Sequence, residues 1–378
     1  MRILHAIDSC APSAGGVAEA VIRLSEAMHE LGVDATIVSG DDPNASFLPD
    51  LQVKVHALGP SRLGSYGYLP TMRSWLQEHA TRQDAVVVHG LWQYPSVIVR
   101  KALRGCSTPY YIYPHGMLDP WFKKAYPWKH LKKALFWKFS QSKVLQDARS
   151  VCFTTDEERR LAQNTFSPYQ CRETVVGLGS VDPPAELDTH KETFYRNFPQ
   201  ARDRKIMLFL ARIHPKKGAD MLLQAFGEIA AGSDLLVLAG PCEDHTHEQQ
   251  LRATASGFAD RVLWTGMLEG NLKWGALRAA EALALPSHQE NFGIVVAEAL
   301  AVGTPVLISD KVNLWREVIE DDAGVVAPDD IDGTRTLLKH AATKGLAKER
   351  QNARQCFDKR FSIRRGAANL HELIQGDL

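Results

Sequence analysis

Short apolar runs alternate with helix-length segments along this chain, and that alternation constrains the fold more than any other feature. In the first half, the runs expected to form strands are Ile3–Ile7, Ala35–Val38, Val53–Ala57, Ala85–His89, Tyr110–Tyr113, Val151–Thr154 and Thr174–Val176. In the second half, they are Ile206–Leu210, Leu235–Ala239, Val262–Trp264, Ala282–Leu285, Val306–Ile308 and Gly324–Val326. Strands joined by helix-length connections form parallel sheets that are covered by helices on both faces. The helices expected between them include Val17–Leu31, Ala219–Ala230, Leu272–Ala279 and Ile294–Ala301. The pattern predicts an α/β protein.

The alternation begins twice, at Ile3 and at Ile206, which predicts two doubly wound domains. A length of 378 residues suits two domains, at roughly 100–200 residues each. The best hinge is Gly177–Pro184, because glycines and adjacent prolines interrupt helices and strands. We therefore predict domains at residues 1–182 and 183–360, followed by a C-terminal helix in residues 361–378. The apolar stripe of that helix is formed by Ile363, Ala367, Leu370 and Ile374.

Composition and charge exclude several classes of protein. Hydrophobic residues make up 45% of the chain and charged residues 23%, which is typical of folded and not of disordered proteins. The 44 basic and 44 acidic residues balance, so a generally basic, nucleic-acid-binding surface is disfavoured. The six cysteines form no C-x-x-C pair, the opening residues form no signal-peptide core, and no apolar run has membrane-spanning length. We therefore expect a cytoplasmic protein.

The strongest local motif is Pro286–Gly303, PSHQENFGIVVAEALAVG, which follows an expected strand and opens a helix. Unpaired amides of Phe292–Ile294 at the helix start would bind an anion, and phosphate suits such a site best. Glu290 precedes the helix and Glu298 lies inside it, so their spacing predicts different roles. The alternative is that Glu290 only complements the helix dipole and that Glu298 is a solvated charge.

A second motif, Ala211–Gly218 (ARIHPKKG), follows the first strand of the same domain. It lacks the G-x-x-x-x-G-K-[ST] pattern of a Walker loop. Arg212 and Lys217 nevertheless leave the carboxyl end of a parallel strand, where α/β sheets bind their ligands. Taken singly they would be surface cations. Beside an amide-lined helix start, the two together would neutralise a diphosphate.

Two weaker features lie in the first half of the chain. Cys10–Val17 (CAPSAGGV) joins the first strand to the first helix, and its diglycine permits close backbone approach or merely forms a turn. His115 directly follows the strand Tyr110–Tyr113, again on a carboxyl-end loop. A structural histidine and a functional one remain equally good interpretations there.

Together these motifs resemble the retaining glycosyltransferases of family 4, the group 1 glycosyltransferases with the GT-B architecture. The resemblance covers essentially the whole chain: GGV at the first helix, PHG in the first domain, R-x4-K-G, and P-S-x-x-E-x-F-G followed eight residues later by a second Glu. It implies two Rossmann-like domains that face a central cleft, with the C-terminal helix packing back toward the first domain. One departure is Gly177–Asp182, which reads GLGSVD where many relatives have a P-N-G-V-D-like stretch. This removes the basis for a ligand contact through the hinge and leaves the donor site unaffected.

The resemblance also implies roles for individual residues. Arg212 and Lys217 would hold the donor diphosphate, Glu290 would contact hydroxyls of the donor sugar, and Glu298 would contact those of the ribose. His115 would touch the transferred sugar. The residues implied in donor binding are Gly16, Arg212, Lys217, Gly266, Met267, Leu268, Glu290, Asn291, Phe292, Gly293, Ile294 and Glu298. Those implied in catalysis are His115, Glu290, Arg212 and Lys217.

The implied activity is retaining transfer of a hexose from a nucleotide-diphosphate sugar, UDP-glucose-like, to a saccharide or lipid-linked saccharide in polysaccharide or glycoconjugate synthesis. No cofactor and no metal are expected, because the cations replace a metal. The one D-x-D, Asp330–Asp332, precedes a helical stretch and is interpreted as a helix cap. A nucleotide-sugar 2-epimerase of the same fold and a non-catalytic nucleotide-sugar or membrane-surface binding module remain alternatives. A dinucleotide oxidoreductase is disfavoured, because no strand-to-helix turn reads G-x-G-x-x-G.

The segment Trp121–Leu145 contains many lysines and no acidic residue. Trp128, Leu131, Leu135 and Phe139 share one helical face, and lysines lie to one side of it. Such a mixture suits an anionic membrane surface, here the inner face of the plasma membrane, or a charged acceptor. The alternative is a solvated basic helix whose aromatic residues pack in the core.

Overall fold

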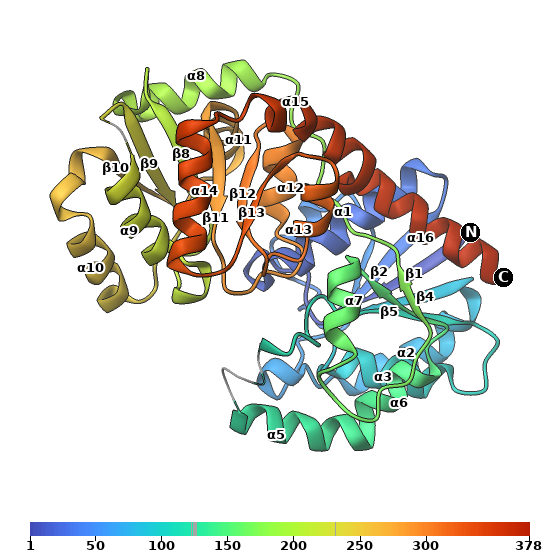
Figure 1. Cartoon of the computed structure of the whole chain (residues 1–378). Helices are drawn as coiled ribbons and strands as arrows, with labels where there is room; N and C mark the ends of the chain where they lie inside the picture. Colours follow the sequence, from blue (N-terminus) through green and yellow to red (C-terminus); the bar gives the residue numbers. More distant parts are fainter. Residues whose placement is uncertain (122, 124–126, 231) are drawn as a thin grey trace. The chain divides into compact units, whose positions relative to one another are not determined.

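The computed structural model describes residues 1–121, 123, 127–230 and 232–378 of the chain. It divides into two compact units (Figure 1). Unit 1 contains Met1–Ser180 together with Ile363–Leu378, and unit 2 contains Val181–Ser362. The chain passes from one unit to the other between Ser180 and Val181, inside the segment 177–184 that the sequence marks as the hinge.

Unit 1 is built on a seven-stranded parallel sheet in the order β3-β2-β1-β4-β5-β6-β7. Its strands are β1 (Arg2–Ala6), β2 (Asp34–Ser39), β3 (Val55–Ala57), β4 (Ala85–His89), β5 (Tyr110–Tyr113), β6 (Ser150–Phe153) and β7 (Glu173–Val175). Among the described residues, its helices include α1 (Gly16–Glu30), α2 (Pro70–His79), α3 (Tyr94–Leu103), α5 (Pro127–Phe136), α6 (Ser142–Asp147), α7 (Asp156–Ala162) and α16 (Ile363–Asp377). The central strands β1 and β4 are buried almost throughout, as expected of strands covered on both faces.

Helix α16 belongs to unit 1 although it ends the chain. The predicted stripe is buried, because Ala367, Leu370 and Ile374 are fully covered and Ile363 is only 6% exposed. At its end, Asp377 accepts a hydrogen bond of 3.0 Å from the Tyr111 hydroxyl and pairs with Arg149 and Arg172. Apolar packing along the helix and ion pairs at its end therefore attach α16 to the rest of unit 1.

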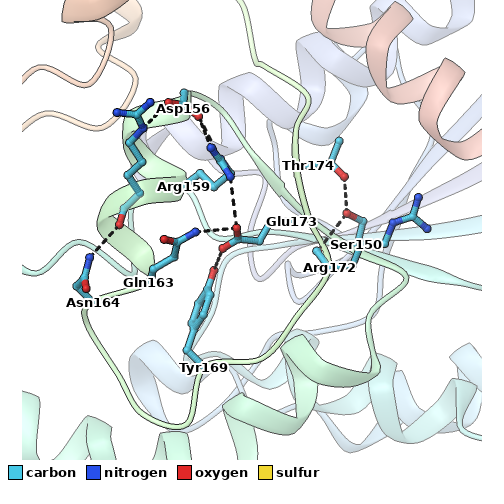
Figure 2. A network of polar contacts seen from close by, with 10 residues as sticks. Ser150, Asp156, Arg159, Gln163, Asn164, Tyr169, Arg172, Glu173 and Thr174 are labelled. Atoms are coloured by element: carbon cyan, nitrogen blue, oxygen red, sulfur yellow. Dashed lines mark hydrogen bonds and ion pairs between the residues drawn. The ribbon is translucent and has the colours of Figure 1, made fainter.

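A polar network fixes the segment that joins α7 to β7 (Figure 2). Glu173 on β7 accepts hydrogen bonds from Tyr169 at 2.7 Å and from Gln163 at 2.8 Å. Arg159 on α7 pairs with Asp156 at 2.6 Å and reaches Glu173 at 3.6 Å. The network links the helix to the edge strand, and each of its groups has a structural partner, so we assign it no ligand.

Unit 2 contains a six-stranded parallel sheet in the order β10-β9-β8-β11-β12-β13. Its strands are β8 (Lys205–Leu210), β9 (Asp234–Ala239), β10 (Val262–Gly266), β11 (Ala282–Leu285), β12 (Val306–Ser309) and β13 (Gly324–Ala327). Its helices are α8 (Leu187–Asn197), α9 (Ala219–Ile229), α10 (His245–Thr254), α11 (Gly270–Ala279), α12 (Ile294–Ala301), α13 (Trp315–Glu320), α14 (Ile331–Thr343) and α15 (Ala347–Cys356).

Helix α8 lies between the hinge and β8, where the sequence analysis names no helix. The helix is mostly polar and packs against α11 (Figure 1). The contact is close at Gly275 on α11, where a Cβ atom would lie 2.1 Å from the carbonyl oxygen of His190. Backbone approach at a glycine, which apolar periodicity does not reveal, therefore holds this helix in place.

Both sheets share one topology, in which the chain starts in the middle, moves to one edge, returns and then builds the other edge. The direction reverses between β1 and β4 in unit 1 and between β8 and β11 in unit 2. In such sheets, ligands bind at the carboxyl ends of the strands on either side of this reversal. Among the described residues, no helix is long and apolar enough to cross a membrane.

Candidate functional site

In unit 2, the two loops that carry the sequence motifs meet at the β8/β11 reversal. The His288 amide donates a hydrogen bond of 2.9 Å to the Lys216 carbonyl. Gly218 has a left-handed backbone with φ of +71°, and a Cβ atom there would lie 2.3 Å from the carbonyl oxygen of Pro286. A larger residue would push the loops apart, so this glycine is required for their contact.

Lys217 and Glu290 form an ion pair between these loops, with 13% and 22% of their side chains exposed. The main chain of Glu290 is fixed on the other side. Its amide donates to the Lys311 carbonyl at 2.9 Å, and its carbonyl accepts from the Asn313 amide at 3.1 Å. The carboxylate and the ammonium are therefore held at one place, still within reach of a ligand.

Helix α12 begins where the motif predicts, with Gly293 as its N-cap in the left-handed region at φ of +67°. The amides of Gly293, Ile294 and Val295 precede the first amide that donates within the helix, that of Val296, which donates to the Gly293 carbonyl at 2.7 Å. Phe292 is buried and anchors the turn, while the Asn291 side chain accepts a hydrogen bond of 3.3 Å from Asn313. The turn thus follows the carboxyl end of β11 and continues directly from Glu290, the partner of Lys217.

Glu298 lies inside α12 and is 7% exposed, which excludes the alternative of a solvated charge. Its carboxylate accepts a hydrogen bond of 2.5 Å from Lys273 on α11. The two glutamates of the motif are therefore paired with different lysines, Glu290 with Lys217 and Glu298 with Lys273. The two side chains therefore lie in different places, as their spacing predicts.

Arg212 is exposed and lines a hollow together with residues of the loop that follows β9. That loop approaches closely at Gly240, where a Cβ atom would lie 1.9 Å from the Ala211 carbonyl oxygen. The pKa of His214 is lowered, first by burial and then by the positive charges of Arg212, Lys216 and Lys217. Burial is thus the main cause of this shift, and the three neighbouring cations add to it.

The loop Gly266–Leu268 follows β10 at the same edge. The Gly266 carbonyl accepts a hydrogen bond of 2.8 Å from the Gly240 amide, which joins this loop to the Arg212 hollow. Met267 is 64% exposed and Leu268 is 5% exposed. The structure therefore brings the predicted donor residues of unit 2 to one edge, from β10 through β9 and β8 to β11.

The two predicted residues of unit 1 lie at the carboxyl edge of its own sheet. Gly16 is the first residue of α1 and is exposed, after Gly15 with φ of +80°. His115 follows β5, is half-buried and has a left-handed backbone with φ of +49°. Its Nε2 lies 3.0 Å from Nδ1 of His89, so the histidine is not isolated.

Sequence reasoning missed four polar residues at these edges: Lys273, His5, His89 and Asp8. Lys273 partners Glu298, and only the α11–α12 contact reveals it. His89 contacts His5 at 2.9 Å and ends an expected strand, which was the available signal. Asp8 follows β1 and accepts a hydrogen bond of 3.0 Å from Gln93. Its pKa is raised, first by burial and then by Asp41.

Asp330 and Asp332 both have structural partners. Asp330 caps α14, accepting a hydrogen bond of 2.7 Å from the Gly333 amide, and Asp332 pairs with Arg335 at 2.7 Å. The predicted capping role is confirmed. Within the described ranges there is no group of three or more His, Cys, Asp or Glu side chains able to hold a metal ion.

The lysine-rich segment Trp121–Leu145 is only partly buried in the core of unit 1. Trp137 is 1% exposed, but the predicted stripe lies open to solvent: Trp128 is 81% exposed, Leu131 56%, Leu135 58% and Phe139 71%. The alternative of a basic helix with core-packed aromatics is therefore wrong for this stripe. Phe122, Lys124 and Tyr126 of the same segment lie outside the described residues.

Two family models match the chain. Residues 15–179 match the "Glycosyl transferase 4-like domain" and residues 191–355 match "Glycosyl transferases group 1". A D-inositol 3-phosphate glycosyltransferase of Xylanimonas cellulosilytica is 36% identical over 154 residues, 40% of this chain and 37% of the relative. A phosphatidyl-myo-inositol mannosyltransferase of Mycolicibacterium smegmatis is 35% identical over 143 residues, 36% of each chain. The matched stretches thus span less than half of these relatives.

Solved structures resemble the whole chain. The Anabaena protein HepE, in complex with UDP and glucose, superposes with a TM-score of 0.77 at 17% identity, covering 100% of both chains. Sucrose-phosphate synthase from Thermosynechococcus elongatus gives a TM-score of 0.75 at 19% identity, covering 99% of this chain and 98% of that one. These likenesses establish the fold. Because the two family models together match both units, the chain belongs to the group 1 glycosyltransferases, with the GT-B fold.

Proposed function

We propose that the protein is a retaining, metal-independent glycosyltransferase that moves a hexose from a nucleotide-diphosphate sugar to a saccharide or lipid-linked saccharide in polysaccharide or glycoconjugate synthesis. The observation that carries the proposal is the cationic edge of unit 2, where Lys217 and the start of α12 lie together. Lysine, arginine and helix-start amides are the groups that bind phosphate in proteins.

Each charged group of that edge has a distinct task in the proposal. Lys217 and Arg212 bind the diphosphate, and the α12 amides donate to its oxygens. Glu290, held beside Lys217, accepts hydrogen bonds from hydroxyls of the donor sugar. Glu298, nearly buried and paired with Lys273, accepts hydrogen bonds from the ribose hydroxyls.

The proposed transfer is a front-face substitution with retention. The bond between the anomeric carbon and the diphosphate oxygen breaks, and its electron pair leaves with the diphosphate. The acceptor oxygen bonds to the same face of the anomeric carbon, and its proton passes to the departing phosphate oxygen. Lys217, Arg212 and the α12 amides stabilise the charge that builds up on the leaving group, which is the task that a bound metal ion performs in other transferases.

UDP is the proposed nucleotide, and a UDP-glucose-like sugar the proposed donor. HepE, which shares the fold over its whole length, was solved with UDP-glucose. The loop Gly266–Leu268 and its hydrogen bond to Gly240 give the base a main-chain surface at the end of the same edge. The relatives named for inositol phosphate and phosphatidyl-inositol support a charged or lipid-linked acceptor.

The exposed stripe of α5 and of the π-helical segment Trp137–Gln141 that follows it is the proposed membrane-facing surface of unit 1. Apolar side chains at 56–81% exposure are unfavourable in water, and basic residues flank them. Lys129 and Lys132 are exposed, whereas Lys133 lies over the Trp92 ring at 4.7 Å and has its pKa lowered by burial and by Lys129. An anionic lipid surface complements both features, with the apolar groups inserted and the exposed lysines near the headgroups.

A donor panel tests the proposed function. Purified protein is titrated with UDP, UDP-glucose, GDP-mannose and ADP-glucose by thermal shift, and then incubated with the preferred donor with and without acceptor. A uridine donor should raise the melting temperature most, because a ligand that binds only the folded state stabilises it. Product that keeps the anomeric configuration of the donor is expected. Conversion of the donor sugar without acceptor would instead identify an epimerase, and binding without turnover a binding module.

A further inference from the structure

Three histidines form a hydrogen-bonded chain across neighbouring strands of unit 1. His5 lies on β1, His89 ends β4 and His115 follows β5, and these strands are adjacent in the sheet. Nδ1 of His5 lies 2.9 Å from Nε2 of His89, and Nδ1 of His89 lies 3.0 Å from Nε2 of His115. Each link joins two ring nitrogens, so every link needs one protonated and one unprotonated nitrogen.

Burial sets the charge of this chain. His5 and His89 are 0% and 2% exposed, and Tyr113 stacks on both His89 and His115. Burial lowers the pKa of His5 to about 3, helped by His29, and lowers the pKa of His115 to about 4. The pKa of His89 is also well below its ordinary value, through burial and its two histidine neighbours. All three rings are therefore neutral at physiological pH, with one proton each.

With one proton on each ring and one protonated nitrogen in each link, only two sets of tautomers are possible. In the first, every ring is protonated on Nδ1. His5 then donates to Nε2 of His89, His89 donates to Nε2 of His115, and the Nδ1–H group of His115 remains as a donor. In the second, every ring is protonated on Nε2, so His115 ends the chain with an unprotonated Nδ1. The two arrangements differ at the inner end, where Nε2 of His5 is buried and has no hydrogen-bond partner among the described residues.

The buried Nε2 of His5 distinguishes between the two tautomer arrangements. In the second arrangement, His5 buries an N–H group without an acceptor, whereas in the first it buries only an unprotonated nitrogen. Orphaned buried N–H groups are rarer in proteins than under-satisfied acceptors. We propose that His5 and His89 are positioning residues that hold His115 as a neutral hydrogen-bond donor through Nδ1, directed at an oxygen of the sugar being transferred.

This inference rests on the proposed sugar transfer for its ligand but not for its geometry. An oxocarbenium-like transition state develops positive charge on the sugar ring. An imidazolium beside it would repel that charge, whereas a neutral N–H group still binds a sugar oxygen. The histidine chain therefore supplies a fixed donor without adding a cation, unlike the lysines of unit 2.

The direct test is ¹⁵N NMR of the histidine side chains in the ligand-free protein. Signals are assigned with single substitutions, and protonated and unprotonated ring nitrogens are told apart by their chemical shifts. We expect protonated Nδ1 in His5, His89 and His115 at pH 7.5. Protonated Nε2 in His115 would overturn the proposal. This readout needs no donor sugar, so it stands even when no transfer activity is found.

Two substitutions of equal size sharpen the test. His5→Asn keeps an N–H donor next to Nε2 of His89, whereas His5→Asp places a carboxylate there that accepts a proton and reverses the chain. At pH 8 we expect kcat of His5→Asn within threefold of wild type. For His5→Asp we expect kcat at least tenfold lower, unchanged affinity for UDP and Nε2-protonated His115. Equal activity of the two variants would contradict the proposal, and the wild-type spectrum decides the matter where His5→Asp does not fold.

Discussion

The two units share one sheet topology but carry different kinds of polar group at the carboxyl ends of their strands. In unit 2, the reversal between β8 and β11 presents lysine–carboxylate pairs and a helix start. In unit 1, the reversal between β1 and β4 presents a chain of neutral histidines and the carboxyl group of Asp8, whose pKa is raised. The fold fixes where the ligand groups lie, and the residues at the strand ends decide which ligand chemistry fits. Cations and helix-start amides suit phosphates, whereas neutral imidazoles suit sugar hydroxyls.

We expect the largest effect on transfer from a substitution of Lys217, the cation at the edge of unit 2. Lys217→Ala removes a cation from the leaving group and leaves Glu290 without this partner. We expect kcat to fall by about 10²–10³, as for loss of one preorganised electrostatic contact. The matched control is Lys205→Ala, an exposed lysine at the opposite end of β8, which should retain wild-type kinetics. Comparable losses in both variants would remove Lys217 from catalysis.

Glu298 tests whether the second ion pair binds donor or only supports α12. Glu298→Gln keeps the shape of the side chain but loses the charge that accepts from Lys273. Donor affinity measured by calorimetry should weaken by about 1.5–3 kcal/mol. Glu281→Gln, which breaks a partly exposed pair with Arg350 at the other end of β11, is the control and should leave affinity unchanged. Wild-type affinity in Glu298→Gln would make that pair purely structural.

Acidification should act on unit 1 through its histidine chain. The folded-state pKa of His5, about 3, lies below the ordinary value of 6.5, so the unfolded chain binds a proton first. Stability present above pH 6.5 is therefore lost progressively as the pH falls toward 3. At pH 5 this amounts to about 2 kcal/mol for one such histidine.

Hydrogen exchange of the β1 and β4 amides at pH 7.5 and 5.0 measures that loss locally. The difference in opening free energy between the two pH values should shrink in His5→Asn and stay unchanged in His245→Asn, which alters an exposed histidine. If the pH dependence were equal in wild type and His5→Asn, the pKa of His5 would have to be the same in the folded and the unfolded chain, which contradicts the prediction.

The smallest effect is expected at the surface of α5. Lys129 and Lys132 are exposed beside the apolar stripe, and their joint substitution by Gln should weaken binding to anionic vesicles by about 1 kcal/mol per lysine. Added salt should reproduce the effect. Lys339 and Lys344 of unit 2 provide the matched double substitution, with no expected change. Vesicle binding that is insensitive to both salt and Lys129 would remove the electrostatic part of the membrane proposal.

Local sequence signals predicted the framework of the molecule well. Helix α12 has the predicted bounds, and the stripe of α16 is buried as its periodicity indicates. The spacing of Glu290 and Glu298 predicts that they lie in different places, and their separate lysine partners confirm this. These features depend on residues a few positions apart, which periodicity and turn chemistry describe directly.

Pairings between distant residues could not be predicted. Lys273 lies 25 residues before Glu298 and resembles any lysine of an amphipathic helix. His5 and His89 occur inside apolar strands, where a histidine is most often a packed residue, and only the order of β1, β4 and β5 makes them neighbours. The polar helix α8 was missed for a related reason, since it buries only His190 and Phe194 and approaches α11 closely at Gly275.

The central claim is that unit 2 binds a nucleoside diphosphate with its own cations. Calorimetric titration of the wild-type protein with UDP, once in EDTA and once in Mg²⁺, tests it most directly. The account predicts saturable binding at one site per chain, with the same affinity in both buffers and markedly weaker binding in Lys217→Ala. Absence of binding in EDTA, with full recovery in Mg²⁺, would contradict it.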